Sequence, residues 1–311
     1  MFDAVFHADW SINAKKRWLA KAERLQSGWL ISSLEKVQPT LVGQLQKEAR
    51  DKRVLAGFDF PIGVPAKWAE KRKIGSFPGF LDQLAKDPES PFFKVAGTQH
   101  EISLERPFYP ATAKAGVEQK HLYQSLGFQS FSELRRKCEA RADNRQPACL
   151  LFWTLGANQV GKGAILGWRE VVIPCVKAGA QLWPFDGELG MESPNGLIIA
   201  ETYPAEMYGW LGAENVRKEG KRNQDARKAV AIQILTWASL KGVSIASPLQ
   251  DIVKNGFGGK PEGEDPFDAF CGVCGMIEVA SGCRHHGAPT DEAIRKYEGW
   301  ILGLNKHDLR A

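Results

Sequence analysis

The chain has 311 residues, of which 43% are hydrophobic and 25% are charged, and its formal net charge is +5. These values are typical of a globular protein with a large core, and they argue against a disordered chain. No window approaches the roughly 18 uncharged apolar residues of a bilayer-spanning helix, and residues 1–25 lack the apolar segment of a signal peptide. Six cysteines in a chain of this length suggest reduced thiols, so we expect a cytoplasmic protein with no membrane partner.

The first 63 residues predict three strands, a helix and a fourth strand. The strands are expected over residues 2–8, 17–25, 29–37 and 54–60. Pro39 and Thr40 open the helix, in which Leu41 and Leu45 recur at helical spacing. The fourth strand is a nearly continuous apolar run, as is typical of a parallel strand covered on both faces. A right-handed crossover would place this strand beside the first one.

Residues 66–195 show a different pattern, with Pro and Gly punctuation and no convincing strand. Helices are expected over residues 131–143 and 164–178. A segment of ~130 residues is far longer than an ordinary connection, so it must carry structure of its own. We interpret it as a mainly helical insertion within a single domain that spans residues 1–311.

The remainder of the chain returns to the sheet and ends in a further helix. Strands are expected over residues 196–203 and 243–246, and helices over residues 223–241 and 265–281. Gly282 ends the last helix. Small residues in its middle, Gly272 and Gly275 among them, would let this helix approach the sheet closely.

Four acidic residues lie within or at the ends of apolar elements. They are Asp9, Asp59, Glu201 and Asp268. An ionised carboxylate beside a buried strand is costly unless it is paired. Several carboxylates at one edge of a sheet would repel one another, and a divalent cation is the usual remedy. The pattern therefore indicates metal-dependent chemistry, with oxygen ligands that favour Mg²⁺ or Mn²⁺ over zinc.

Local structure offers a second explanation for some of these acids. Asp9 suits the start of a polar turn. Asp265, Pro266 and Asp268 suit the N-cap, first helical position and capping box of the last helix. The two roles can also be divided, with Asp265 as the cap and Asp268 projecting into the site. If both project, their spacing places them on one face of the helix, and Asp265 becomes a further metal ligand.

Two polar segments are candidates for substrate binding. A glycine-rich turn at residues 156–163 presents Asn158, Gln159 and Lys162, although it lacks the spacing of a phosphate-binding loop. Lys221 and Arg222 belong to a basic stretch that opens a helix. Such a stretch is typical of a solvated face, and it also suits contact with phosphates.

Five motifs, taken together, resemble a known family. They are His-Ala-Asp-Trp (7–10), Phe-Asp-Phe-Pro-Ile-Gly-Val-Pro (58–65), Glu-Thr-Tyr-Pro-Ala-Glu (201–206), Asp-Pro-Phe-Asp-Ala-Phe (265–270) and Glu-Gly-Trp-Ile-Leu-Gly (298–303). In this order they resemble an uncharacterised domain family described as predicted RNase H-like nucleases. Ala8 departs from the Gly that commonly precedes the first Asp. The resemblance implies an α/β fold with a mixed sheet of strand order 3-2-1-4-5 and flanking helices.

We therefore expect a metal-dependent nuclease, in which Asp9, Asp59, Glu201 and Asp268 surround Mg²⁺ or Mn²⁺ and the substrate is nucleic acid. In a 3-2-1-4-5 sheet, strand five lies two strands from strand one, so Glu201 would serve a second metal or the substrate. Two alternatives stay open. One is a nucleotide-dependent phosphotransferase of the sugar-kinase class, and the other is a non-catalytic binding protein on the same fold.

Overall fold

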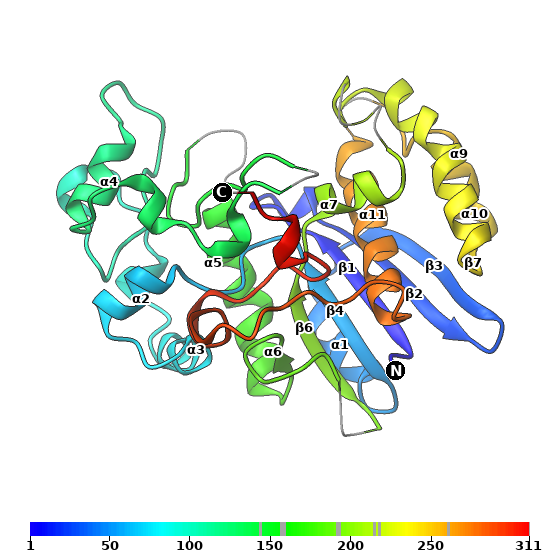
Figure 1. The fold of residues 1–311 in the computed structure, drawn as a ribbon, viewed down its shortest axis with the longest axis horizontal. Coiled ribbons are helices and arrows are strands. Elements are labelled where there is room, and N and C mark those ends of the chain that lie inside the picture. Colours follow the sequence, from blue (N-terminus) through cyan, green and yellow to red (C-terminus); the bar gives the residue numbers. More distant parts are fainter. Residues whose placement is uncertain are drawn as a thin grey trace.

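A computed structural model describes residues 1–142, 145–155, 160–190, 194–213, 216, 219–259 and 262–310. Its centre is a seven-stranded mixed sheet with helices on both faces (Figure 1). The strands are β1 (Ala4–Asp9), β2 (Trp18–Leu25), β3 (Gly28–Lys36), β4 (Arg53–Phe58), β5 (Gln181–Leu182), β6 (Gly196–Glu201) and β7 (Val243–Ile245). The α/β class predicted from the sequence is therefore confirmed.

The strands lie in the order β5-β6-β4-β1-β2-β3-β7. β2 is antiparallel to β1 and β3, whereas β4 runs parallel to both β1 and β6. The five strands expected for the central sheet are thus neighbours in the sequence β3-β2-β1-β4-β6, and the crossover places β4 beside β1. β7 and β5 extend the sheet by one strand at each edge, through parallel pairs with β3 and β6.

Alternating side chains of each strand feed two separate cores, as the period of two in a strand requires. Val5 and Leu55 point to the first face, whereas Phe6 and Ala56 point to the second. The first face is covered by α7 (Pro204–Trp210), α9 (Gln224–Leu240), α10 (Ser247–Lys254) and α11 (Glu264–Ala280). The second is covered by α1 (Leu41–Glu48) and by helices of the inserted segment.

The inserted segment, residues 66–195, is mainly helical but is not free of strands. Its helices are α2 (Ala66–Arg72), α3 (Phe77–Lys86), α4 (Gln119–Ser125), α5 (Val160–Gly167) and α6 (Ile173–Lys177), and they gather on one side of the molecule in Figure 1. The expectation that it holds no strand is wrong, because β5 pairs with β6. β5 has only two residues, too few for any periodicity to show.

The prediction of a single helix over residues 131–143 is also wrong. Two short 3-10 helices, Phe131–Leu134 and Lys137–Glu139, take its place. Between them Arg135 and Arg136 are extended, and this break directs the Arg136 side chain into the protein interior. In contrast, the helix expected over residues 164–178 is present and begins earlier, with a π-helical segment, Trp168–Val172, joining α5 to α6.

Helix α11 packs unusually close to the sheet, as its small residues predict. A Cβ atom at Gly272 would lie 2.2 Å from ring atoms of His7 on β1. One at Gly275 would lie 2.5 Å from the sulfur of Met207 on α7. His7 is fully buried beneath the helix, where its Nε2 bonds the Thr202 hydroxyl at 2.9 Å. Burial lowers the pKa of His7 to about 3, so the ring is a neutral core group.

Among the described residues, no helix is long and apolar enough to cross a membrane.

The close approach of α11 can be tested by adding one methyl group. Gly272→Ala should lower the free energy of unfolding by at least about 2 kcal/mol, because the new Cβ overlaps the His7 ring and packed cores tolerate little extra volume. Gly43→Ala on α1 is the matched control. A Cβ there meets nothing within 4 Å, so the variant should be stabilised by roughly 0.5–1 kcal/mol. Equal urea-denaturation midpoints for the two variants would contradict the packing described for α11.

Candidate functional site

Asp9 and Asp59 lie side by side at the carboxyl ends of two parallel strands. Ala8 of β1 is paired with Phe58 of β4, and the Asp59 amide donates to the Ala8 carbonyl at 3.4 Å. Since Ala8 and Phe58 point to the second face, alternation places both acids on the first face, under α11. A side-chain hydrogen bond joins the two carboxyl groups. The sequence-based expectation that strands one and four bring these acids together agrees with this arrangement.

Helix α11 adds two further acids to the same place. Asp268 is buried, with 4% of its surface exposed, whereas Asp265 is half-buried at the edge. The N-cap of α11 is Gly263, and it makes no side-chain capping bond. Asp265 is therefore not the cap that the sequence suggested. Asp268 acts electrostatically on both Asp9 and Asp59, and Asp265 acts on Asp9. We call Asp9, Asp59, Asp265 and Asp268 the carboxylate cluster.

Protein donors already contact part of the cluster. The Tyr208 hydroxyl donates to one oxygen of Asp268, and the Lys221 ammonium donates to the other. The backbone amide of Trp10 donates to Asp59 Oδ1 at 2.6 Å. Arg227, fully buried, holds the Lys221 carbonyl with its guanidinium and so fixes the chain at that point. Lys221 is thus an internal counter-ion of the cluster.

The cluster carries more negative charge than Lys221 neutralises, and the acids respond by retaining protons. Burial, followed by the charges of Asp59 and Asp268, raises the pKa of Asp9 well above its usual range. Burial also raises the pKa of Asp59 to about 7, against the Trp10 amide bond that lowers it. In the absence of another cation, Asp9 and Asp59 therefore share a proton near neutral pH, as two adjacent carboxyl groups do.

A row of side chains continues from the cluster across the sheet. Asp9 is the cross-strand partner of Trp18 on β2, and Trp18 is the partner of Lys36 on β3. The Lys36 ammonium lies 4.1 Å from the centre of the Trp18 ring. Partial desolvation of the otherwise exposed Lys36 lowers its pKa, and the charges of Asp265 and Asp9 oppose this shift. Neither residue was predicted from the sequence, although counting back along the β1–β2 hairpin pairs Trp18 with Asp9.

Glu201 lies near the cluster in the sheet but points the other way. It is the partner of Phe58 in the β4–β6 pair, so it shares the second face with Phe58 and not the first face with Asp59. Both carboxylate oxygens accept hydrogen bonds from Arg136 at 2.7 Å, and Oε2 also accepts one from the Ile62 amide at 2.7 Å. We therefore leave Glu201 out of the proposed ligand set.

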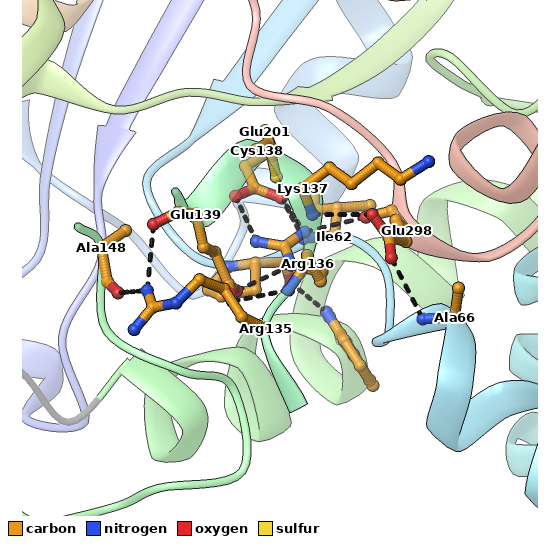
Figure 2. Close-up of polar contacts among 12 residues, drawn as sticks. Ile62, Ala66, Arg135, Arg136, Lys137, Cys138, Glu139, Ala148, Glu201 and Glu298 are labelled. Atoms are coloured by element: carbon orange, nitrogen blue, oxygen red, sulfur yellow. Dashed lines mark hydrogen bonds and ion pairs between the residues drawn. The ribbon is translucent and has the colours of Figure 1, made fainter. Parts of the chain in front are cut away.

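Arg136 is the centre of a buried ionic network that Figure 2 shows. Besides Glu201, its guanidinium contacts the Glu139 carboxylate at 2.8 Å and the Glu298 carbonyl at 3.0 Å. The Glu298 carboxylate in turn accepts from the amides of Lys137 and Ala66 at 2.7 and 3.2 Å. This network ties the inserted segment to the end of β6 and to the C-terminal segment, which is a structural role.

The predicted substrate-binding residues are scattered. Lys162 on α5 donates to the Ala111 carbonyl inside the inserted segment at 2.8 Å. Arg222 is exposed and contacts Glu264 at 3.2 Å. Lys221 alone of the predicted basic residues is shown to contact the cluster. Asn158 and Gln159 lie outside the described residues.

The donor atoms of the carboxylate cluster suit a hard divalent cation, but the side chains are not positioned to bind one in this structure. The donors are carboxylate oxygens without Cys or His, which is the set that Mg²⁺ and Mn²⁺ prefer. Within the described ranges, however, no group of three or more His, Cys, Asp or Glu residues is disposed to hold a metal ion. The contacts of Asp268 give a physical reason, since Lys221 and Tyr208 occupy its two oxygens. Binding a cation through Asp268 would require Lys221 to move away.

The shared proton predicts a pH dependence of stability. The pKa values of Asp9 and Asp59 are raised on folding. Their contribution to the free energy of unfolding is therefore fully present below about pH 4 and is lost as the pH rises through about 7. Asp59→Asn should reduce this slope, leaving the part that comes from the burial of Asp9, and should stabilise the metal-free protein above neutrality by on the order of 2–4 kcal/mol. Urea denaturation across this range, with exposed Asp82→Asn as control, measures the difference. Parallel profiles for wild type and Asp59→Asn would exclude the shared proton.

The Arg136 network predicts a large loss of stability without a direct effect on the cluster. Arg136→Ala should lower the free energy of unfolding by about 3–5 kcal/mol, because Glu201 and Glu139 would stay buried without a partner charge. Arg135→Ala is the control, since among the described residues Arg135 bonds only the carbonyls of Glu139 and Ala148. Arg135→Ala should lower the free energy of unfolding by about 1 kcal/mol or less for each hydrogen bond that is lost. Similar losses for both variants would argue against a structural role for the Glu201 ion pair.

Comparison with known proteins gives no match: no family model, no curated protein and no solved structure matches the chain.

Proposed function

We propose that the carboxylate cluster binds Mg²⁺ or Mn²⁺ and that the protein is a nuclease of RNase H-like fold, which hydrolyses phosphodiester bonds of nucleic acid. The observation that carries the proposal is the convergence of Asp9, Asp59 and Asp268 at the carboxyl ends of parallel strands, with the Lys221 ammonium in contact with Asp268. Ligand sites in open α/β sheets lie at this edge. The strand order β3-β2-β1-β4-β6 supports the fold assignment.

Each residue of the cluster would have a defined part. Asp9, Asp59 and Asp268 would hold the cation, and Asp265 would add negative charge at the edge. A bound divalent cation would supply an acidified water and stabilise charge on the leaving oxygen. Tyr208 would orient the Asp268 carboxylate through its hydrogen bond. Lys221, once released from Asp268, would be free to contact a phosphate.

The row from Asp9 to Lys36 suggests how the substrate would lie. Lys36 and Lys16 are exposed beside the cluster, and Lys16 acts electrostatically on Asp265. Two lysines next to the carboxylates are suited to the phosphates that flank the scissile bond. Trp18, between Asp9 and Lys36 in the row, offers an aromatic surface, which suits an unpaired base. The six free cysteines support a cytoplasmic location, which stays a prediction.

The ion pair between Lys221 and Asp268 favours one alternative, a non-catalytic binding protein. In that case Lys221 would neutralise the cluster permanently, and no cation would be needed. Nothing comparable supports a sugar-kinase-like phosphotransferase, because the turn after β1 leads through Trp10 and Ser11 into a 3-10 helix, Ala14–Lys16, without a glycine.

Metal titration separates the nuclease from the binding protein. Mg²⁺ or Mn²⁺ at 100 times its dissociation constant should stabilise the wild type by about 2.7 kcal/mol, because the cation binds only the folded state. Asp9→Asn should raise the metal-free melting temperature, and both Asp9→Asn and Asp268→Asn should lose this response. Lys221→Ala should bind the cation more tightly than wild type, because the competing ammonium is gone. Exposed Asp251→Asn on α10 serves as control. A wild-type melting temperature that millimolar divalent cation leaves unchanged would favour the binding protein.

Cleavage assays test the activity itself. The wild type should cleave nucleic acid only with Mg²⁺ or Mn²⁺. The cleavage rate of Asp59→Asn and of Asp268→Asn should each be at least about 100-fold lower, since the ligands of one metal act as a unit. Lys36→Gln should raise KM more than it lowers kcat, whereas Lys47→Gln, on α1 and the opposite face, should change neither. A panel of single-stranded, double-stranded and hybrid substrates is required. Metal-loaded, folded protein that cleaves none of them would overturn the nuclease assignment.

A further inference from the structure

A recess lies at the far end of α11, away from the carboxylate cluster. It has a volume of about 480 Å³ and opens to solvent. Glu278, in its wall, is ten residues beyond Asp268 on the same helix, which corresponds to roughly 15 Å at 1.5 Å per residue. The recess is therefore a separate feature of the surface. Its lining residues are Trp210, Trp237, Lys241, Glu278, Cys283, Arg284, His285 and Asn305.

Arg284 lines this recess, and within the described part of the chain most of its hydrogen-bonding capacity is unused. Its guanidinium lies over the Trp210 ring, 3.1 Å from the ring centre, and it donates to the Gly303 carbonyl at 3.3 Å. Over the described ranges of the chain, no carboxylate lies within ion-pair distance of Arg284. A guanidinium has five N–H donors in a fixed plane. Stacking on Trp210 therefore fixes the plane while leaving donors available.

The acids closest to Arg284 are already engaged by other groups. Glu278 accepts from the Trp237 ring nitrogen at 2.6 Å and from the Lys241 ammonium at 3.1 Å. Glu206 is paired with Arg145 at 2.5 Å. Asp308 acts on Arg284 only at longer range. The recess thus holds three groups that can donate hydrogen bonds, from Arg284, Lys241 and His285. Its one acid, Glu278, is already paired with Lys241.

We propose that this recess binds a phosphate group, either inorganic phosphate or the terminal phosphate of a small phosphomonoester. Arginine recognises phosphate through two parallel hydrogen bonds, and a fixed guanidinium loses little entropy in doing so. Lys241 and His285 also line the recess and can supply further donors. The volume lies within the range of small-molecule sites, so there is room for an organic group beyond the phosphate. This binding does not depend on the nuclease proposal.

Binding can be measured by calorimetry on the full chain with two ligands, inorganic phosphate and a nucleoside 5′-monophosphate, without divalent cation. Arg284→Gln should weaken binding about tenfold or more, because hydrogen bonds to a charged group are lost. Arg284→Lys should retain part of the affinity. Arg24→Gln, an exposed arginine on β2, and Asp268→Asn in the cluster should both bind as wild type does. Affinity for both ligands indicates a site for phosphate itself, and affinity for the nucleotide alone indicates a phosphomonoester site.

Cys283 provides a second readout that does not require a folded Arg284 variant. It is the exposed cysteine of the chain and lines the recess. Ligand should slow its alkylation, measured by mass spectrometry of the Cys283 peptide, while leaving the rate at Cys149 unchanged. Two results would overturn the proposal. One is the absence of binding and of Cys283 protection at millimolar ligand. The other is binding that survives Arg284→Gln but is lost in Asp268→Asn, which would place the ligand at the carboxylate cluster.

Discussion

The close packing of α11 on β1 is the constraint on which the candidate site depends. Gly272 lets the helix lie directly on His7, with no room for even a methyl group between them. That contact places Asp268, one turn earlier, above the ends of β1 and β4, where Asp9 and Asp59 already lie. The resulting concentration of carboxyl groups costs stability in the metal-free protein, because burial and mutual repulsion both oppose ionisation. The packing of α11 therefore holds the carboxyl groups together despite their mutual repulsion.

The two faces of the sheet divide the acidic residues between two roles. Residues at the ends of neighbouring strands point up or down according to register alone, so Asp59 and Glu201 diverge although they follow adjacent strands. On the first face the Lys221 ammonium contacts Asp268 beside Asp9 and Asp59. On the second face Glu201 meets Arg136, which satisfies both oxygens and anchors the inserted segment. The same residue type thus supports chemistry on one face and stability on the other, and the difference lies in the cation that each acid meets.

The sequence allowed much of the sheet to be predicted, because its central strands are long apolar runs with clear turns between them. Asp9, Asp59 and Asp268 could also be found, since each interrupts an apolar run. The face of the sheet to which Glu201 points could not be predicted, because it depends on the register between β4 and β6. The bent path around Arg136 and the contact between Lys221 and Asp268 depend on partners more than 40 residues away, and local periodicity carries no such information. Trp18 and Lys36 needed only the hairpin register, which the sequence does contain.

A crystal structure of the protein soaked with Mn²⁺ would show whether the carboxylate cluster holds a cation. We expect an anomalous scattering peak between the carboxylates of Asp9, Asp59 and Asp268, with the Lys221 ammonium withdrawn from Asp268. Well-ordered carboxylates without a peak, and Lys221 still bound to Asp268 at saturating Mn²⁺, would contradict it.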